Sequence, residues 1–265
     1  MWLLFSVSKG VYSRKTMKKL AALAVFIAVF ASLGISDAPP KDSEFIFARV
    51  QFNMNFSAGY RYREAPWHHD YPYSEDLYLT MLKETTVVHS TPESYQIVRL
   101  DSPDIFKYPF LYFSEPGFMD LTTKEVNGLR EYLNRGGFAM FDDFRGRDLT
   151  NLREQMKVVF PNREMTRLDV SHSVFHTFYD IESLAMDPPY GTRRAFVPGF
   201  DPRFMEGTTE FWGMSDESGR LIIIANQNND FGEFWEWVDR GEMPFKPAAL
   251  SVRFGINYLV YAMTH

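Results

Sequence analysis

The stretch YPFLYFSEPGFMDLTTKEVNGLREYLNRGGFAMFDDFRG, residues 108–146, decides the fold. Residues 108–115 form a continuous apolar run, which is typical of strands buried on both faces of a parallel sheet. Thr122 and Glu125 then form a capping box, and a helix with one apolar stripe follows until Gly136-Gly137. A second strand is expected at 138–142. Residues 108–143 therefore have the length and order of one strand–helix–strand unit.

The rest of the chain repeats this alternation. Further strands are expected at 45–52, 95–100 and 220–228, and further helices at 75–85, 149–160, 231–240 and from Pro247 onward. Alternating buried strands and amphipathic helices predict an α/β fold with a mostly parallel sheet sandwiched by helices. We expect a single domain over 44–265. Residues 185–218 are rich in Gly and Pro and are expected to form an irregular insertion.

The N-terminus has the pattern of a secretory signal. Lys18 and Lys19 precede an uncharged run over 20–35, and Ser36-Asp37-Ala38 places small residues at the two positions that a signal peptidase reads. We therefore expect a signal peptide over 1–38, a linker over 39–43 and a periplasmic or extracellular protein. Met17 is a plausible true start, with 1–16 a mis-start. The alternative is an uncleaved helix that anchors the protein to the membrane, although the run is short for a span.

Charge and composition exclude several classes of function. Five of the 28 basic and one of the 34 acidic residues lie in 1–38, which leaves residues 39–265 with a net charge of −10. Such a surface repels phosphate backbones, so nucleic acid is not expected as a partner. The absence of cysteine excludes disulfides, thiolate catalysis, cysteine-bound zinc and lipoprotein attachment. The chain has no P-loop, dinucleotide fingerprint or G-x-S-x-G motif, and no cofactor is expected.

Polar residues follow several expected strands at the point where each strand ends. In parallel sheets these ends meet at one edge, where ligands bind. The predicted site at this edge consists of residues that follow three of the strands: Glu115; Asp142, Asp143 and Arg145; and Asn226 and Asn228. The loop 53–74 follows the first strand and should reach the same edge.

Asp142 and Asp143 are the leading candidates for chemistry. Either could act as a general acid or base or bind a metal, and we expect a functional one to be partly open to solvent. The alternative is a structural role, as a helix cap or as a partner of Arg145. Asn226 is a better ligand-binding candidate than Asp230, which suits the N-cap of the following helix.

Histidines and aromatic residues supply the remaining candidates. Tyr60, Arg63, Trp67 and His68 lie in an aromatic loop that suits a sugar or a protein partner, or that is ordered by its own stacking. His68-His69-Asp70 could hold a metal, but adjacent histidines rarely chelate one ion. His172 is a candidate catalytic residue. His172 and His176 have a metal-compatible spacing without the glutamate of a zincin helix, so polar packing is favoured and no metal site is expected.

The quoted stretch, together with LIIIANQNNDFGEFWEW (221–237) and FGINYLVYAMT (254–264), resembles the domain of unknown function 4159 family of bacterial exported and membrane-anchored proteins. The resemblance implies a class I glutamine amidotransferase-like fold, which is a flavodoxin-like α/β sandwich. In true amidotransferases a cysteine nucleophile follows a central strand. Here Asp142-Asp143-Phe144-Arg145-Gly146 occupies that place, so the nucleophile is missing.

Two hypotheses follow for function. The favoured one is an exported, non-catalytic module of the cell envelope that binds a protein partner or a glycan through its strand-end cleft and aromatic loop. The alternative is a hydrolase that uses Asp142 or Asp143 with a histidine on a glycan or a peptide. A histidine nitrogen within hydrogen-bond reach of an aspartate in an open cleft would favour the enzyme.

Overall fold

The computed structural model describes residues 45–55, 65–91, 93–186 and 208–265. The expected signal peptide over 1–38 and linker over 39–43 lie outside the described residues, as do Tyr60 and Arg63 of the aromatic loop. The description below concerns the compact unit that begins at Pro40.

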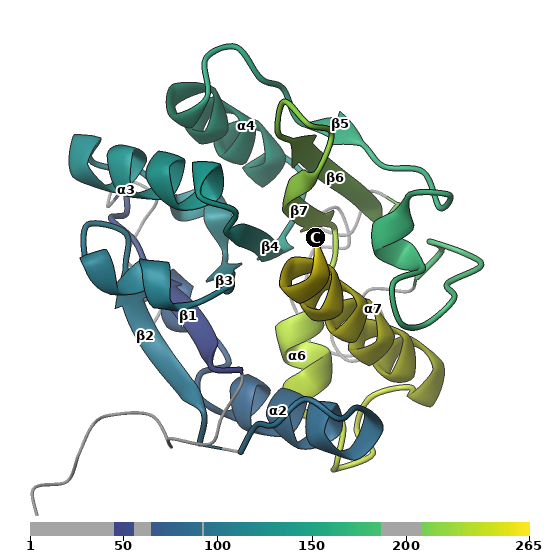
Figure 1. Cartoon of the computed structure of the whole chain (residues 1–265). Helices are drawn as coiled ribbons and strands as arrows, with labels where there is room; N and C mark the ends of the chain where they lie inside the picture. Colours follow the sequence, from purple (N-terminus) through teal and green to yellow (C-terminus); the bar gives the residue numbers. More distant parts are fainter. Residues whose placement is uncertain (1–44, 56–64, 92, 187–207) are drawn as a thin grey trace, which may run out of the picture. The chain divides into compact units, whose positions relative to one another are not determined.

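A seven-stranded sheet forms the centre of this unit (Figure 1), with the strand order β2-β1-β3-β4-β7-β6-β5. The first five strands in this order are parallel to one another, whereas β6 is antiparallel to β7 and β5 is antiparallel to β6. In that order, the strands are Tyr95–Arg99, Phe47–Gln51, Phe110–Ser114, Phe138–Phe144, Leu221–Gln227, Glu210–Ser215 and Thr166–Arg167.

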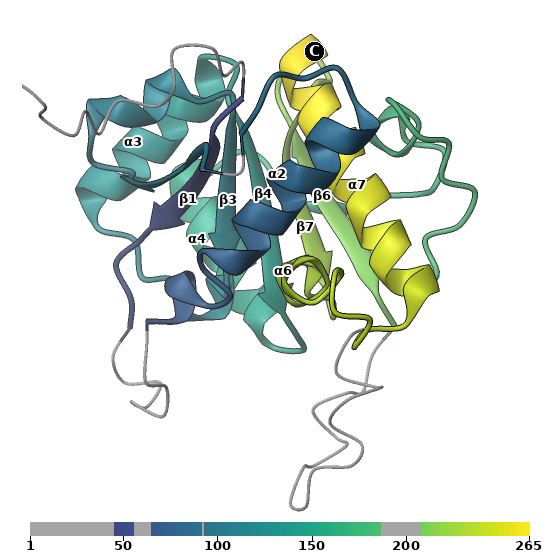
Figure 2. The same cartoon turned by 90° about the horizontal axis from the view of Figure 1, so that it is seen from below.

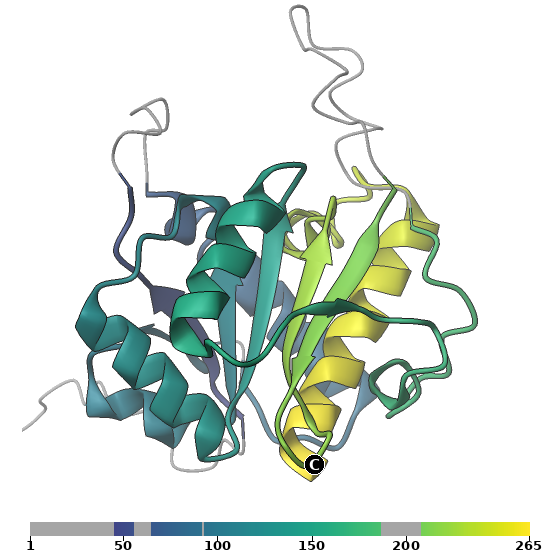
Figure 3. The ribbon, with the colours of Figure 1, turned by 90° about the horizontal axis from the view of Figure 1, so that it is seen from above.

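Helices cover both faces of the sheet (Figure 2). One face is covered by α3 (Thr123–Asn134) and α4 (Asp148–Val159). The other is covered by α2 (Tyr73–Thr85), α6 (Phe231–Glu236) and α7 (Phe245–Thr264). Figure 3 shows the molecule from the side opposite to that of Figure 2, with α3 and α4 in front of the sheet. This is the helix-sandwiched, mostly parallel α/β architecture that the sequence predicts.

Alternate residues of the central strands build two separate cores. Phe110 and Tyr112 of β3 pack towards α2, α6 and α7, whereas Leu111 and Phe113 pack towards α3 and α4. Because successive side chains of a strand point to opposite faces, a strand covered on both sides is apolar at most consecutive positions. The continuous apolar runs in the sequence are the direct result.

The predicted strand–helix–strand unit is confirmed. β3, β4 and β7 are parallel neighbours, and α3 lies between β3 and β4 in the chain. The capping box forms as expected, with Thr122 Oγ1 accepting from the backbone N–H of Glu125, and the Glu125 carboxylate accepting from the backbone N–H of Thr122.

Several elements differ from the sequence-based expectation, including the short strand β5, which was not expected. β4 continues to Phe144, so Asp142 and Asp143 lie inside the strand, where the register shifts between Phe141 and Phe144. Part of the expected irregular segment forms strand β6 of the sheet, whose Phe211 and Met214 join the cores on its two faces. α6 ends at Glu236 rather than near 240. Within the described residues, no helix is both long enough and apolar enough to cross a bilayer.

Candidate functional site

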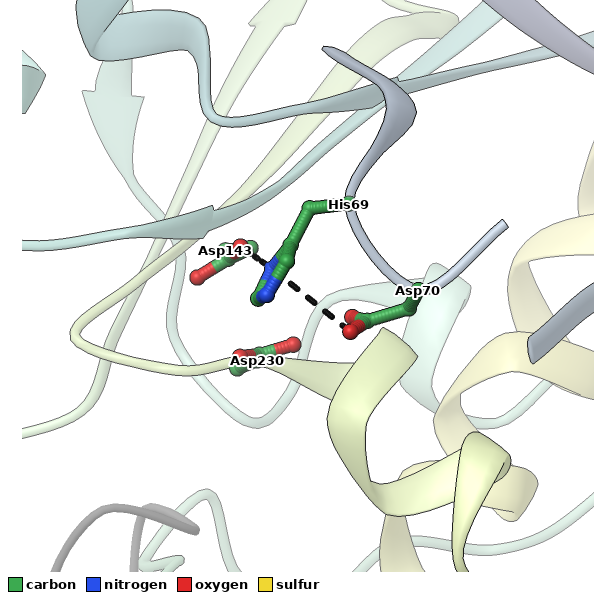
Figure 4. Close-up of side chains that lie close together, drawn as sticks. All are labelled: His69, Asp70, Asp143 and Asp230. Atoms are coloured by element: carbon green, nitrogen blue, oxygen red, sulfur yellow. Dashed lines mark hydrogen bonds and ion pairs between the residues drawn. The ribbon is translucent and has the colours of Figure 1, made fainter. Parts of the chain in front are cut away.

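The carboxyl ends of four parallel strands bring one histidine and four carboxylates together. Figure 4 shows His69 with three of these carboxylates, Asp70, Asp143 and Asp230. His69 and Asp70 lie in the connection after β1, Glu115 follows β3, Asp143 lies near the end of β4, and Asp230 follows β7. β1 pairs with β2 on one side and with β3 on the other. The order in which the chain adds strands to the sheet therefore reverses at β1. Open α/β sheets bind their ligands beside such a point. We call His69, Asp70, Glu115, Asp143 and Asp230 the acidic cluster.

Nδ1 of His69 is the centre of the acidic cluster. It lies 3.0 Å from Asp143 Oδ2 and 3.5 Å from Asp70 Oδ1. Glu115 Oε1 is 3.9 Å away. The His69 side chain retains 29% of its surface, whereas those of Asp70 and Asp143 retain 3% and 1%. The imidazole is therefore partly exposed to solvent and also contacts buried carboxylates.

The cluster contains more acidic groups than basic ones, and each changes the pKa of its neighbours. Burial lowers the pKa of His69, but the hydrogen bond with Asp143 and the charges of Asp70 and Asp143 outweigh it and raise the pKa to about 10. His69 is therefore protonated at neutral pH. Burial and the nearby charge of Asp143 raise the pKa of Glu115 to about 8, and burial raises the pKa of Asp70 well above its ordinary value. One imidazolium faces four acidic side chains.

Two buried carboxylate oxygens of the cluster lack hydrogen bonds. Asp70 Oδ2 and Glu115 Oε2 have no hydrogen-bond partner within the described part of the chain. Nearly all buried polar side-chain atoms in proteins are hydrogen-bonded, so each exception calls for an explanation. Eight buried side-chain atoms of the described residues lack a partner, and two of them, both carboxylate oxygens, belong to the acidic cluster.

The backbone is strained at the same place. Four described residues other than glycine have a left-handed φ, and three of them belong to the cluster: Asp70 (64°), Glu115 (49°) and Asp143 (53°). This conformation costs on the order of 1–3 kcal/mol per residue and concentrates at functional sites. Asp tolerates it better than most residues, whereas Glu115 has no such advantage. The strain directs three carboxylates towards one point.

Arg49 of β1 fixes the connection that carries His69. Its guanidinium donates to the backbone oxygens of Trp67 at 3.1 Å and His69 at 2.7 Å. It also pairs with Glu75, and both side chains of this ion pair are fully buried. The residue thus holds the loop over the carboxyl end of β1 and positions the imidazole.

Asp142 has a structural role. Its carboxylate accepts hydrogen bonds from four donors: Tyr112 Oη (3.1 Å), Asn226 Nδ2 (2.9 Å), Phe231 N (2.7 Å) and Gly232 N (3.1 Å). The expectation of a partly open aspartate is wrong for both Asp142 and Asp143, which are 0% and 3% exposed. The physical reason is that β4 extends past both residues, and the loop carrying His69 covers Asp143.

The asparagines and Arg145 support the neighbouring turns. Asn226 is buried between Asp142 and the Tyr258 hydroxyl, which donates to its Oδ1 at 3.2 Å. Asn228 accepts from the backbone N–H of Gly146 at 3.0 Å and donates to Thr208 O at 2.9 Å. The charge of Arg145 acts on Glu115 and lowers its pKa, although burial outweighs that effect. None of these three residues belongs to the acidic cluster.

The other candidates do not join the cluster. His172 caps a short 3₁₀ helix, since its Nδ1 accepts from Val174 N at 3.2 Å. His176 pairs with Asp180 and donates from Nε2 to Val170 O at 2.6 Å, which agrees with polar packing. The rings of Trp67 and His68 lie edge-to-face, with centroids 5.3 Å apart, and His68 also contacts Tyr71.

Sequence reasoning did not favour His69, Asp70 or Asp230 as site residues. The strand-end rule placed the loop 53–74 at the same edge as Glu115 and Asp143, and His68-His69-Asp70 was considered as a metal site, but adjacent histidines weighed against it. Asp230 does cap α6 as expected, accepting from Glu233 N at 2.8 Å, but it also belongs to the cluster.

One protein family matches the chain. Residues 47–263 match the family model described as "Domain of unknown function (DUF4159)". No curated protein matches the chain.

Proposed function

Since the chain belongs to the DUF4159 family, whose description names no activity, we propose a function from the site itself: a non-catalytic, ligand-binding module of the cell envelope that takes a cationic group at the acidic cluster. The observation that carries this proposal is the pair of buried carboxylate oxygens, on Asp70 and Glu115, without hydrogen-bond partners in the described part of the chain.

The energetic argument is direct. A buried carboxylate without a partner loses its hydration and gains nothing in return. Neighbouring carboxylates add repulsion, because each disfavours the ionised form of the other. A cation that enters between them offsets both costs. The ligand-free protein is thus destabilised at the place where a cation would stabilise it.

The strand arrangement supports the finer fold assignment. The five parallel strands follow the order β2-β1-β3-β4-β7, which corresponds to the flavodoxin-like order 2-1-3-4-5 when the fifth parallel strand is counted in sequence. We therefore propose the amidotransferase-like architecture that the family resemblance implies. Asp142 and Asp143 stand at the nucleophile position and the chain has no cysteine, which supports a binding role over amide transfer.

Location in the envelope rests on the N-terminal sequence alone. Lys18 and Lys19, the uncharged run over 20–35 and the small residues at 36 and 38 support export. A cationic ligand at the cluster can be a metal ion, an amine of a glycan or a lysine of an envelope protein.

A thermal-shift panel tests the proposal. The purified, tag-free protein is melted with divalent metal chlorides and with primary amines such as ethylamine and lysine methyl ester, at matched ionic strength. At least one cation should raise the melting temperature in a saturable way, because a ligand that binds the folded state stabilises it. Asp143→Asn should abolish the shift. Asp169→Asn, which changes an acid in a turn outside the cluster, is the matched control. No saturable shift with any cation would refute the proposal.

A second candidate is the Asp/His hydrolase. It is favoured by one observation, the 3.0 Å contact of His69 Nδ1 with Asp143. A protonated His69 serves as an acid rather than as a base at neutral pH, and the aspartate is buried, so the binding role is better supported. Turnover of glycosidic or peptide substrates that is lost in His69→Gln would favour the enzyme.

A further inference from the structure

Four side chains of the acidic cluster present metal-ligand atoms to one point. One ring nitrogen of His69 and one oxygen each of Asp70, Asp143 and Asp230 all lie within 4.8 Å of one another. Ligands about 2.1 Å from an ion are about 3.4 Å apart in a tetrahedron and up to about 4.2 Å apart across an octahedron. Small side-chain movements would therefore bring all four into one coordination sphere.

The donor set indicates the class of ion. Carboxylates alone suit Mg²⁺, Ca²⁺ and Mn²⁺, whereas imidazole suits Zn²⁺ and other transition metals. A site with one imidazole and three carboxylates fits an ion that accepts both kinds of donor. The three carboxylate ligands, once ionised, offset the charge of a divalent ion.

The orphaned oxygen is an independent observation that points to a ligand. The Asp70 side chain is 3% exposed, and its Oδ2 lacks a hydrogen-bond partner within the described residues. Gly232 leaves room beside it, since a β-carbon at that position would lie 2.8 Å from Asp70 Oδ2 and 3.5 Å from Asp230 Oδ1. The glycine thus allows the two oxygens to approach the same space.

We infer that the acidic cluster is a site for one divalent transition-metal ion of the Mn²⁺ or Zn²⁺ type, bound by Asp70, Asp143 and Asp230 and by Nδ1 of His69, which releases its proton to solvent when the ion binds. This inference deepens the proposed function and rests on it, because it names the cation. Glu115, whose Oε1 is 3.9 Å from the same nitrogen, is the nearest further acid. Asp70 also groups with Glu233 and Glu236, which are half-buried, so acidic side chains continue from the site towards the surface. They supply a route of approach for the ion.

Binding of the metals themselves tests the inference. The tag-free protein is treated with a chelator, dialysed, and titrated calorimetrically with ZnCl₂ and MnCl₂, with MgCl₂ and CaCl₂ for comparison. Asp70→Asn and Asp230→Asn each replace an anionic carboxylate with a weaker, neutral amide donor while keeping a residue that suits a left-handed φ and a helix N-cap, respectively. Asp169→Asn is again the control. Circular dichroism verifies that each variant is folded.

The expected result is one site per chain, with Zn²⁺ or Mn²⁺ bound at least roughly tenfold more tightly than Mg²⁺ or Ca²⁺. Asp70→Asn and Asp230→Asn should each weaken binding by at least roughly tenfold, and Asp169→Asn should leave it unchanged. Equal affinity in the wild type and in Asp70→Asn would overturn the inference. So would a site that prefers Ca²⁺ or Mg²⁺. If no metal binds but an amine stabilises the protein through Asp143, the inference fails and the proposed function stands. If no cation binds, both fail.

Discussion

Asp142 and Asp143 are consecutive in β4 but have different partners. Asp142 Oδ2 accepts from the backbone N–H of Phe231 at 2.7 Å and so joins the sheet to the start of α6, whereas Asp143 contacts His69. The left-handed φ of Asp143 and the register shift beside it separate the two side chains. One carboxylate holds the fold and the other faces the cluster.

Stability should respond in opposite directions at two aspartates. Asp142→Asn places an amide against donor groups and should lower the free energy of unfolding by about 1–3 kcal/mol. Asp70→Asn removes a buried acid whose ionised form is disfavoured by burial and whose Oδ2 has no hydrogen-bond partner among the described residues, and should raise that free energy by on the order of 1 kcal/mol. At ~2–4 °C per kcal/mol for a domain of this size, thermal melts of the metal-free protein resolve both changes. A loss of stability in Asp70→Asn would mean that this carboxylate is structural.

Arg49 should be indispensable for the fold, although it lies on a strand. Arg49→Met leaves the fully buried Glu75 without its cation and releases the loop carbonyls, so we expect a loss of about 3–5 kcal/mol in chemical denaturation. Arg99→Met is the matched control on the neighbouring strand β2. Arg99 is largely exposed and pairs with Asp101, so its loss should cost less than ~1 kcal/mol. Similar losses in the two variants would contradict the assigned role.

Gly232→Ala should crowd the cluster without removing any carboxylate. The added β-carbon would lie 2.8 Å from Asp70 Oδ2 and 2.9 Å from the Tyr112 hydroxyl. We expect a lower melting temperature, by the equivalent of about 1–3 kcal/mol, and weaker cation binding. In an Asp70→Ala background the nearest clash is gone, and the cost of Gly232→Ala should shrink. Additive effects in this double-mutant cycle would show that the two residues do not interact.

His172 should make stability depend on pH through its role as a cap. Burial lowers the pKa of His172, and the neutral ring accepts from Val174 N. A histidine with a lowered pKa in the folded state contributes fully above the unfolded pKa of about 6.5, and this contribution is lost as the pH falls below that value. His172→Asn keeps an acceptor that does not titrate. Melting temperatures of both proteins between pH 5 and 8 should therefore converge or cross at acidic pH. A difference that is constant with pH rules out this linkage.

Export is testable by the mature N-terminus. The native protein should begin near Pro39 and accumulate outside the cytoplasm, because 36–38 has the small residues that signal peptidase requires. N-terminal sequencing of protein from fractionated cells measures this. An intact Met1 or Met17 in a membrane fraction would identify the segment as an anchor instead.

The α/β fold could be predicted from the sequence because strands that are buried on both faces appear as continuous apolar runs. β3, β4 and β7 had to be apolar at each central position, and the Thr122–Glu125 box marked the start of α3. β6 was missed because Trp212 is half-buried and Gly213 interrupts the apolar pattern. A strand at the antiparallel side of the sheet needs less regular burial and so leaves a weaker pattern.

The site was only partly readable for a different reason. Glu115 and Asp143 were predicted because they follow recognisable strands. The separation of Asp142 from Asp143 depends on a local backbone distortion that residue types do not encode simply, and Asp230 looked fully explained as a helix cap. His69 reaches the cluster through a connection held by Arg49, and a contact between residues 20 apart in sequence leaves no periodic pattern.

The assembly of the cluster from four strand ends has a kinetic consequence. His69 and Asp143 are 74 residues apart, and Asp230 follows the last parallel strand, so these side chains meet only when the sheet is nearly complete. Contacts between distant segments form late in folding. A ligand at the cluster then stabilises the native state but not the transition state, so it should slow unfolding while leaving the folding rate unchanged. The bound cation would therefore extend the lifetime of the folded state without helping the chain to fold.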